Sequence, residues 1–110
     1  MQPLHGLLDM LVLRTLLFGP LHGYGIAKAL RTSSTEALDI DFGSLYPALK
    51  RLEVKGWIAS KWDLSEFNRR AKYYRLTPAG RRHLRNEHAE WTTFASAVAR
   101  VMGAKPEPES

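Results

Sequence analysis

The sequence predicts a mainly α-helical fold with a small β-hairpin. Apolar residues recur at helical spacing in four separate segments. Between the third and fourth of these segments, two short strand-like segments flank a polar connection, which is typical of a hairpin. The chain has 110 residues, of which 45% are hydrophobic, and this is enough for one modest core but not for two. We therefore expect one compact unit.

The first helix is expected over residues 4–18. Its apolar residues cover most of the helix circumference instead of one stripe, so it must be buried on two sides. A protein this small rarely buries a helix all round by itself. We therefore expect a partner subunit to cover the second face, which includes Leu7 and Leu11. Gly19 and Pro20 then end the helix.

A second, amphipathic helix is expected from His22 to Arg31, and the polar residues 32–35 end it. We expect His22 to cap or orient the start of this helix, and a role as a switch or ligand is the alternative. In residues 38–42 apolar and acidic side chains alternate, and this period of two predicts a very short strand.

The third helix is expected to begin near Gly43 or Ser44, with Asp41 as the competing N-cap. Pro47 destabilises the helix little if it lies in the first turn, where a backbone N–H would have no hydrogen-bond partner within the helix. Three leucines spaced at i, i+4 and i+7 predict a buried stripe: Leu45, Leu49 and Leu52. The opposite face is small and basic and carries Ser44, Pro47, Lys50 and Arg51.

After Gly56, which is expected to close the third helix, we expect strands over residues 57–62 and 72–76. The connection over residues 63–70 is polar, so the hairpin should have a charged tip. Tyr73 and Tyr74 alternate along the second strand, so one should face the core and the other should be exposed.

A last helix is expected from Thr77, as N-cap, and Pro78, as first helical residue, to about Met102. Its apolar positions are spaced alternately by four and three residues, which is the heptad rhythm of a coiled-coil seam. Phe94 lies beside this stripe and widens it. The expected seam is therefore Leu84, His88, Trp91, Phe94, Ala95, Val98 and Met102. We expect it to pack against a second copy, so that the protein is an obligate homodimer.

These elements make a winged helix-turn-helix plus a long C-terminal dimerisation helix. We expect the winged helix-turn-helix domain over residues 1–76, a dimerisation helix over residues 77–102 and a disordered tail over residues 103–110.

The charge of the chain points to a polyanionic partner. Lysine and arginine number 16 against 11 acidic residues, for a formal net charge of +5. This excess is concentrated between Ser44 and Arg75, in the third helix and the hairpin. Duplex DNA requires a rigid element that fits the major groove and cations that reach the flanking phosphates, and these two elements supply both.

Eight side chains are the candidate DNA contacts. A hydroxyl near a helix start can contact a base or a phosphate, and longer cations can reach base edges or the backbone. The basic cluster at the hairpin could lie along the backbone or enter the minor groove. The candidates are Tyr24, Ser44, Tyr46, Lys50, Arg51, Arg69, Arg70 and Lys72. A merely solvated face is the alternative interpretation.

We expect no catalysis and no cofactor, because no nucleophile with a paired base, carboxylate pair, phosphate loop or metal set is recognisable. There is no cysteine, and His83 and His88 are five residues apart and lie on different helix faces, so no metal site is expected. The apolar start of the chain lacks a signal-peptide pattern, and Asp9 and Arg14 interrupt it. We therefore expect a cytoplasmic protein with no membrane association.

Three segments resemble the PadR family of transcriptional regulators: GPLHGYGIAKAL (19–30), GSLYPALKRLEVKGWI (43–58) and RRAKYYRLTPAG (69–80). Their order and spacing match the family over nearly the whole chain. The resemblance implies a bacterial winged-helix dimer that recognises its operator through the helix containing Tyr46 and through wing residues Arg69 to Lys72. It also implies a repressor that a small molecule releases.

Only one helix follows the wing, so the chain resembles the short subgroup in which that helix alone completes the dimer. In some short relatives an aromatic-lined cavity at the dimer centre binds flat hydrophobic drugs. Trp91, near the middle of the expected seam, is therefore the candidate effector-binding residue for a small aromatic or hydrophobic molecule. Ordinary dimer packing by Trp91 and Phe94 is the alternative.

Two other function classes stay open at this point. An enzyme is the first, and a winged helix that binds a protein instead of DNA is the second. In the second case, binding should be insensitive to Lys50 and Arg51 and only weakly dependent on salt.

Overall fold

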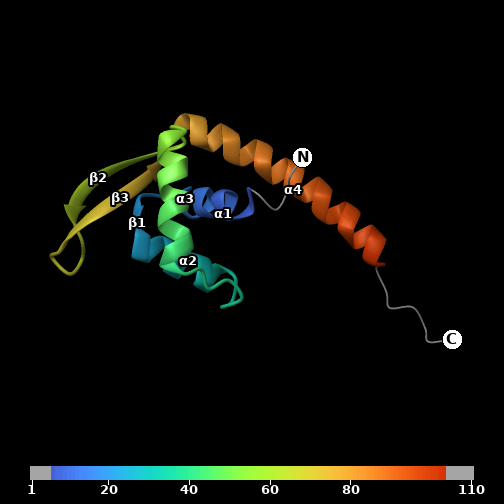
Figure 1. Ribbon diagram of the computed structural model, residues 1–110, viewed down its shortest axis with the longest axis horizontal. Helices are drawn as coiled ribbons and strands as arrows, with labels where there is room; N and C mark the ends of the chain where they lie inside the picture. Colours follow the sequence, from blue (N-terminus) through green and yellow to red (C-terminus); the bar gives the residue numbers. More distant parts are fainter. Residues whose placement is uncertain (1–5, 104–110) are drawn as a thin grey trace.

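The computed structural model describes residues 6–103 and confirms the mainly α-helical fold with a small hairpin (Figure 1). Four helices and three strands occur in this part of the chain. In order they are α1 (Leu7–Thr15), β1 (Leu21–His22), α2 (Gly23–Ser33), α3 (Phe42–Val54), β2 (Ile58–Leu64), β3 (Arg70–Leu76) and α4 (Pro78–Met102). The tail predicted to be disordered lies, from residue 104 on, outside the described residues.

The three strands form an antiparallel sheet in the order β1-β3-β2, with Leu21 opposite Tyr74 and Ile58 opposite Leu76. The strand predicted over residues 38–42 is wrong: residues 38–41 have no regular structure and Phe42 begins α3. An alternating pattern reports only which side chains face the core, and Leu38 and Ile40 are indeed half-buried. A strand also needs a hydrogen-bonding neighbour, and the free edge of β3 is taken by β1 instead.

The wing, formed by β2 and β3, is longer than the sequence predicted. Its loop spans only residues 65–69, because the charged residues at both ends pair in the ladder up to Leu64 opposite Arg70. Asn68 adopts the left-handed conformation (φ 58°) that the turn requires, and the Ser65 hydroxyl accepts hydrogen bonds from the backbone N–H groups of Phe67 and Arg69. Tyr74 faces the core, as predicted for one of the two tyrosines, whereas Tyr73 is half-buried and not exposed, because its ring lies 5.2 Å from that of His22.

The core lies between α1, α2, α3 and the base of the wing. The predicted leucine stripe of α3 is confirmed, since Leu45, Leu49 and Leu52 are fully buried. They pack with apolar side chains from the other helices and from β2, namely Val12, Leu13, Ile26, Leu30 and Ile58. Burial of this kind is worth roughly 1.5–3 kcal/mol for each large aliphatic side chain, so this cluster holds the three helices together.

Side-chain caps set the helix starts. The Gly25 N–H donates to His22 Nδ1 at 2.9 Å, which confirms His22 as the cap of α2. Asp41 is the N-cap of α3 and accepts from the Ser44 N–H at 2.8 Å, so α3 begins at Phe42 and not at Gly43 or Ser44. Pro47 therefore lies in the second turn and not in the first. It removes the hydrogen bond to the Gly43 carbonyl, which is tolerated because this side of α3 faces solvent.

Helix α1 is shorter at its C-terminal end than predicted, ending at Thr15 because the chain turns through residues 16–19 into β1. Residues 4 and 5 of the predicted helix lie outside the described residues. In the described part α1 packs against α2, α3 and α4.

The start of α4 is clamped to the turn between α3 and β2. Thr77 caps the helix by accepting from the Gly80 N–H, as predicted, and its hydroxyl donates to the Gly56 carbonyl at 2.7 Å. A Cβ at Gly80 would lie 1.9 Å from the Trp57 carbonyl oxygen, so only glycine permits this approach. The Trp57 ring stacks on His83 at 3.5 Å. From this clamp α4 extends past the rest of the molecule (Figure 1).

Candidate nucleic-acid interface

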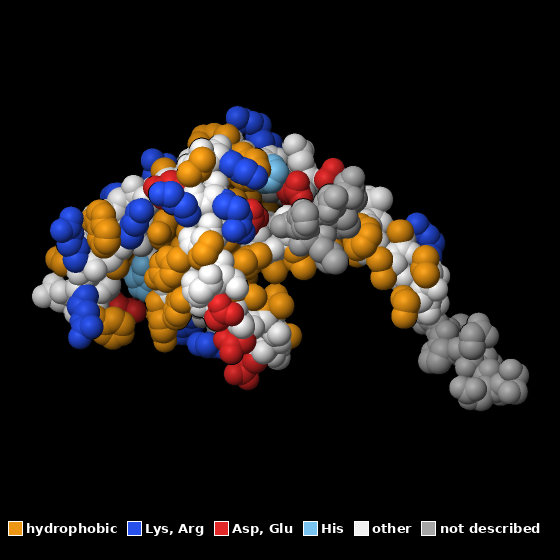
Figure 2. Space-filling model, in the orientation of Figure 1, with side chains coloured by type: hydrophobic (Ala, Val, Ile, Leu, Met, Phe, Trp, Pro, Cys, Tyr) orange, Lys and Arg blue, Asp and Glu red, His pale blue; other side chains and the backbone are white. Residues whose placement is uncertain are grey.

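The outward face of α3 combines a narrow centre with two charged or polar flanks. At about 100° per residue, the face opposite the buried leucines is centred on Gly43, Pro47, Lys50 and Val54. Ser44 and Arg51 lie on one flank, and Tyr46 and Glu53 lie on the other. Figure 2 shows Lys and Arg side chains gathered over α3 and the wing on this side of the molecule. Lys50 is therefore the central cation of the exposed helix.

One flank of α3 is tied to α1 by an ion pair. The Arg51 guanidinium donates to the Asp9 carboxylate at 2.9 Å. Asp9 is only 8% exposed and is the one charged residue buried in the core of residues 6–103, whereas the Arg51 side chain is 49% exposed. The pair joins residues 42 positions apart and sets how α3 lies against α1.

The other flank of α3 is tied to the wing through Glu53. Its carboxylate accepts a short hydrogen bond from the Ser60 hydroxyl on β2 and lies 3.5 Å from Lys72 Nζ on β3. The hydrogen bond from Ser60, followed by the charge of Lys72, lowers the pKa of Glu53 despite partial burial. Burial, followed by the charge of Glu53, raises the pKa of Tyr74. One carboxylate thus joins the helix to both strands of the wing.

A groove of about 700 Å³ separates the wing from the starts of α2 and α3. Five of the eight predicted DNA contacts line it: Tyr24, Tyr46, Arg69, Arg70 and Lys72. In this groove the Tyr46 side chain packs closely on the backbone of Gly23, because a Cβ at Gly23 would lie 2.6 Å from the Tyr46 hydroxyl oxygen. The Arg70 guanidinium lies over the exposed Trp62 ring, 5.2 Å from its centroid. The groove therefore carries cations and phenolic hydroxyls on an aromatic surface.

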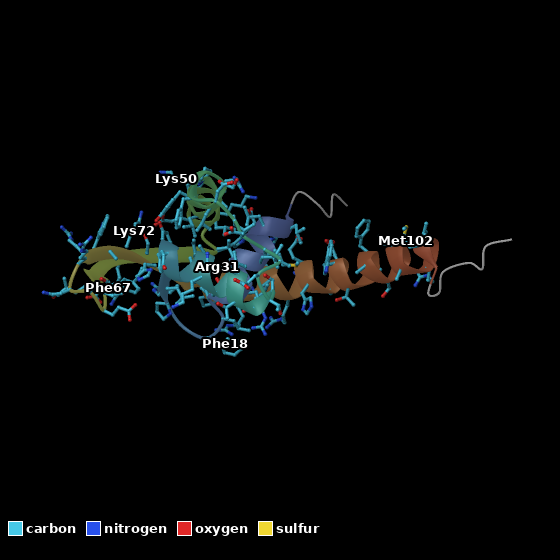
Figure 3. All side chains as sticks on the ribbon, turned by 90° about the horizontal axis from the view of Figure 1, so that it is seen from below. Phe18, Arg31, Lys50, Phe67, Lys72 and Met102 are labelled. Atoms are coloured by element: carbon cyan, nitrogen blue, oxygen red, sulfur yellow. The ribbon has the colours of Figure 1, made fainter. Side chains whose placement is uncertain are left out.

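The other three predicted contacts, Ser44, Lys50 and Arg51, lie outside this groove on the exposed side of α3. In the part of the chain that the structure describes, ion pairs hold Arg51 and Lys72 but none holds Lys50. Figure 3 shows Lys50 and Lys72 on different elements, α3 and the wing.

Sequence reasoning missed Asp9 and Glu53. An acid among the apolar residues at the start of α1 needs a cation as partner once it is buried, and this signal was available for Asp9. The partner itself could not be read from the sequence, because it lies 42 residues away.

A second groove of about 510 Å³ lies between α1 and α4. Its surface is mainly apolar, but Arg14, Arg81 and Arg85 also line it. Four of the nine predicted dimer residues line it: Leu11, Leu84, His88 and Trp91. The Trp91 and Phe94 rings lie 5.8 Å apart. Farther along α4, Val98, Val101 and Met102 are exposed, Val101 to 85%. Of the nine, Leu84 is buried in this chain's own core. Five are half-buried, namely Leu7, Leu11, Trp91, Phe94 and Ala95, and His88, Val98 and Met102 are exposed.

The model of the transcriptional regulator PadR-like family matches residues 12–86. The chain belongs to the PadR-like family. The matched region runs from α1 through the wing into α4, so it includes every predicted DNA contact.

Solved structures agree with this family in fold and in sequence. A PadR family transcriptional regulator from Eggerthella lenta is 36% identical, with a TM-score of 0.76 over 92% of this chain and 86% of that one. One from hypervirulent Clostridium difficile is 32% identical, with a TM-score of 0.77 over 89% and 100%. A transcriptional regulator from Clostridium thermocellum is 31% identical, with a TM-score of 0.79 over 91% and 97%. The winged-helix fold predicted from the sequence is confirmed.

Membership in the PadR-like family makes this chain a DNA-binding regulator of transcription and not an enzyme. Within residues 6–103 no cluster of three or more histidine or acidic side chains is arranged to hold a metal ion. None of the helices in these residues has the length and apolar character needed to cross a membrane.

Proposed function

We propose that this PadR-like regulator represses transcription in the cytoplasm by binding a specific operator as a homodimer, and that a small hydrophobic effector releases it. The observation that carries the proposal is the arrangement of the candidate contacts. Residues from α2, α3 and the wing, far apart in the chain, lie on one side of the molecule around the exposed face of α3. A regulator that binds duplex DNA needs cations placed in this way to neutralise phosphates.

In the proposed complex α3 enters the major groove. Lys50, at the centre of its exposed face, reaches a base edge or a phosphate, and Ser44 and Arg51 face one strand. On the other flank, the Tyr24 and Tyr46 hydroxyls with Arg69, Arg70 and Lys72 follow the opposite backbone or the adjacent minor groove.

The exposed apolar stripe of α4 supports the proposed dimerisation. Val98, Val101 and Met102 have no covering element within residues 6–103, and the groove between α1 and α4 has a mainly apolar surface. A second copy of the same stripe fits this surface by symmetry, because a two-fold interface is self-complementary. The remaining seam residues that we propose for this interface are Leu7, Leu11, Leu84, His88, Trp91, Phe94 and Ala95.

The proposed effector site is the groove beside Trp91. Its lining is mainly apolar, and its volume is within the range of small-molecule sites. A flat aromatic molecule would stack on the Trp91 ring. Packing of Trp91 against the partner is the competing role. Quenching of Trp91 fluorescence by added hydrophobic aromatics, absent in Trp91→Phe, distinguishes the two.

The test is fluorescence anisotropy with the duplex upstream of the protein's own gene and with a scrambled duplex, across a salt series. We expect a clear preference for the upstream duplex and an affinity that falls steeply with salt. Lys50→Glu should lower the affinity about tenfold or more while the melting temperature stays unchanged, because Lys50 is exposed and unpaired among the described residues.

Arg100→Glu is the matched control, since it makes the same charge change on the polar side of distal α4. Weak, salt-insensitive binding that Lys50→Glu does not alter would contradict the proposal and favour a protein partner.

A further inference from the structure

Asp9 occupies an unusual place for a charged side chain. It projects from α1 into the core, where it is 8% exposed, among residues that are otherwise apolar. Burial of a carboxylate is costly unless a cation and hydrogen bonds compensate it. The compensation comes from α3, through the Arg51 guanidinium at 2.9 Å.

Arg51 is only partly used by this contact. A guanidinium carries five N–H donors in a planar fork, and the hydrogen bond to Asp9 involves one terminal nitrogen. Half of the Arg51 side chain remains exposed, on the flank of α3 beside its outward face. One end of the fork is therefore anchored in the core, and the rest is presented to solvent.

We propose that Asp9 is a positioning residue for DNA recognition, which holds the Arg51 guanidinium so that its free N–H groups meet a DNA phosphate. The proposal rests on the DNA contact by Arg51 within the proposed function. An arginine held in its bound orientation has less rotational freedom to lose on binding. Glu53 holds Lys72 on the opposite flank in the same way, but at 3.5 Å and through a carboxylate that is more exposed than that of Asp9.

The proposal predicts the direction in which loss of the Asp9 charge changes DNA affinity. Removal of a negative charge from a protein that binds DNA should by simple electrostatics strengthen binding. If Asp9 positions Arg51, Asp9→Asn should weaken binding instead. The exposed pair of Arg31 with Asp39, 3.7 Å apart on the α2 side, provides a matched control, because Asp39→Asn removes the same charge from a solvent-exposed pair.

The experiment measures operator affinity and its salt dependence for Asp9→Asn, Arg51→Gln and the double variant, with Asp39→Asn as control. We expect each single variant to lose about tenfold in affinity and to lower the salt slope by about one, the loss of one phosphate contact. The double variant should bind no more weakly than Arg51→Gln, because Asp9 acts through Arg51. Asp39→Asn should bind as the unaltered protein does, or slightly more tightly.

Asp9→Asn binding as tightly as the unaltered protein would overturn the proposal. Additive losses in the double variant would also overturn it, because they would show that Asp9 acts on the fold and not through Arg51. If Asp9→Asn fails to fold, Arg51→Lys decides: it keeps the charge and the pair but replaces the fork with a single ammonium. It should weaken operator binding at an unchanged melting temperature, and unchanged affinity would refute the proposal. If the unaltered protein shows no operator preference, the proposed function fails instead.

Discussion

Helices α3 and α4 are both amphipathic, but the rest of the molecule covers their apolar stripes to different extents. The stripe of α3 is completely covered by α1, α2 and the base of the wing. The stripe of α4 is covered only near its start, where Leu84 is buried. Beyond Trp91, no core residue within residues 6–103 packs against it. Figure 1 shows α4 leaving the body of the molecule.

The difference separates two uses of a helix. In α3 the apolar side serves the fold, so the polar side is free to serve recognition. In α4 the apolar side is left uncovered beyond Trp91, and this is the surface that we propose packs against a second copy. Substitutions on each stripe should therefore affect different measurements.

The largest effect is expected from the covered stripe. Leu49→Ala should lower the free energy of unfolding by about 2–5 kcal/mol, because it leaves a cavity in the centre of the core. Val54→Ala, on the exposed side of the same helix, should change it by less than about 0.5 kcal/mol. Urea denaturation followed by circular dichroism measures both. Equal effects would show that the two sides of α3 are not divided as described.

An intermediate effect is expected from the stripe of α4. Trp91→Ala should weaken dimerisation by about 2 kcal/mol, or roughly 30-fold, since large buried aromatics anchor such interfaces. Thr92→Ala, next to it but exposed, should leave the dimer unchanged. Sedimentation equilibrium gives the dissociation constants. A dimer that survives Trp91→Ala intact would place the interface elsewhere.

The smallest effect is expected at the link between α3 and the wing. The folded protein lowers the pKa of Glu53, so its contribution to stability is fully present above the pKa of the unfolded chain and is lost as the pH falls through the lower folded value. Glu53→Gln should therefore be less stable than the unaltered protein at neutral pH, and the difference should shrink in acid. Melting temperatures from pH 3 to pH 7, with Glu66→Gln on the exposed wing loop as control, measure this; a difference independent of pH would contradict it.

Local signals predicted most of the elements. The caps His22 and Thr77 and the leucine spacing of α3 depend on residues within one or two turns, so they could be predicted from the sequence. For α3 the sequence offered Asp41 only as the competing N-cap. The strand predicted over residues 38–42 failed because strand formation depends on a distant neighbour. Five of the residues predicted to bind DNA line one groove between α2, α3 and the wing, and no local pattern describes that groove.

By itself, the sequence determined the helical content, the hairpin, the basic character of the third helix and wing, and the family resemblance, because each is encoded by residue type and spacing along the chain. Only the tertiary structure decided that Leu21 and His22 complete the sheet, that Glu53 ties the helix to the wing, and that Asp9 anchors Arg51. Each of these interactions joins two different elements of the fold, and its energy depends on burial and distance. Both quantities exist only once the chain has folded.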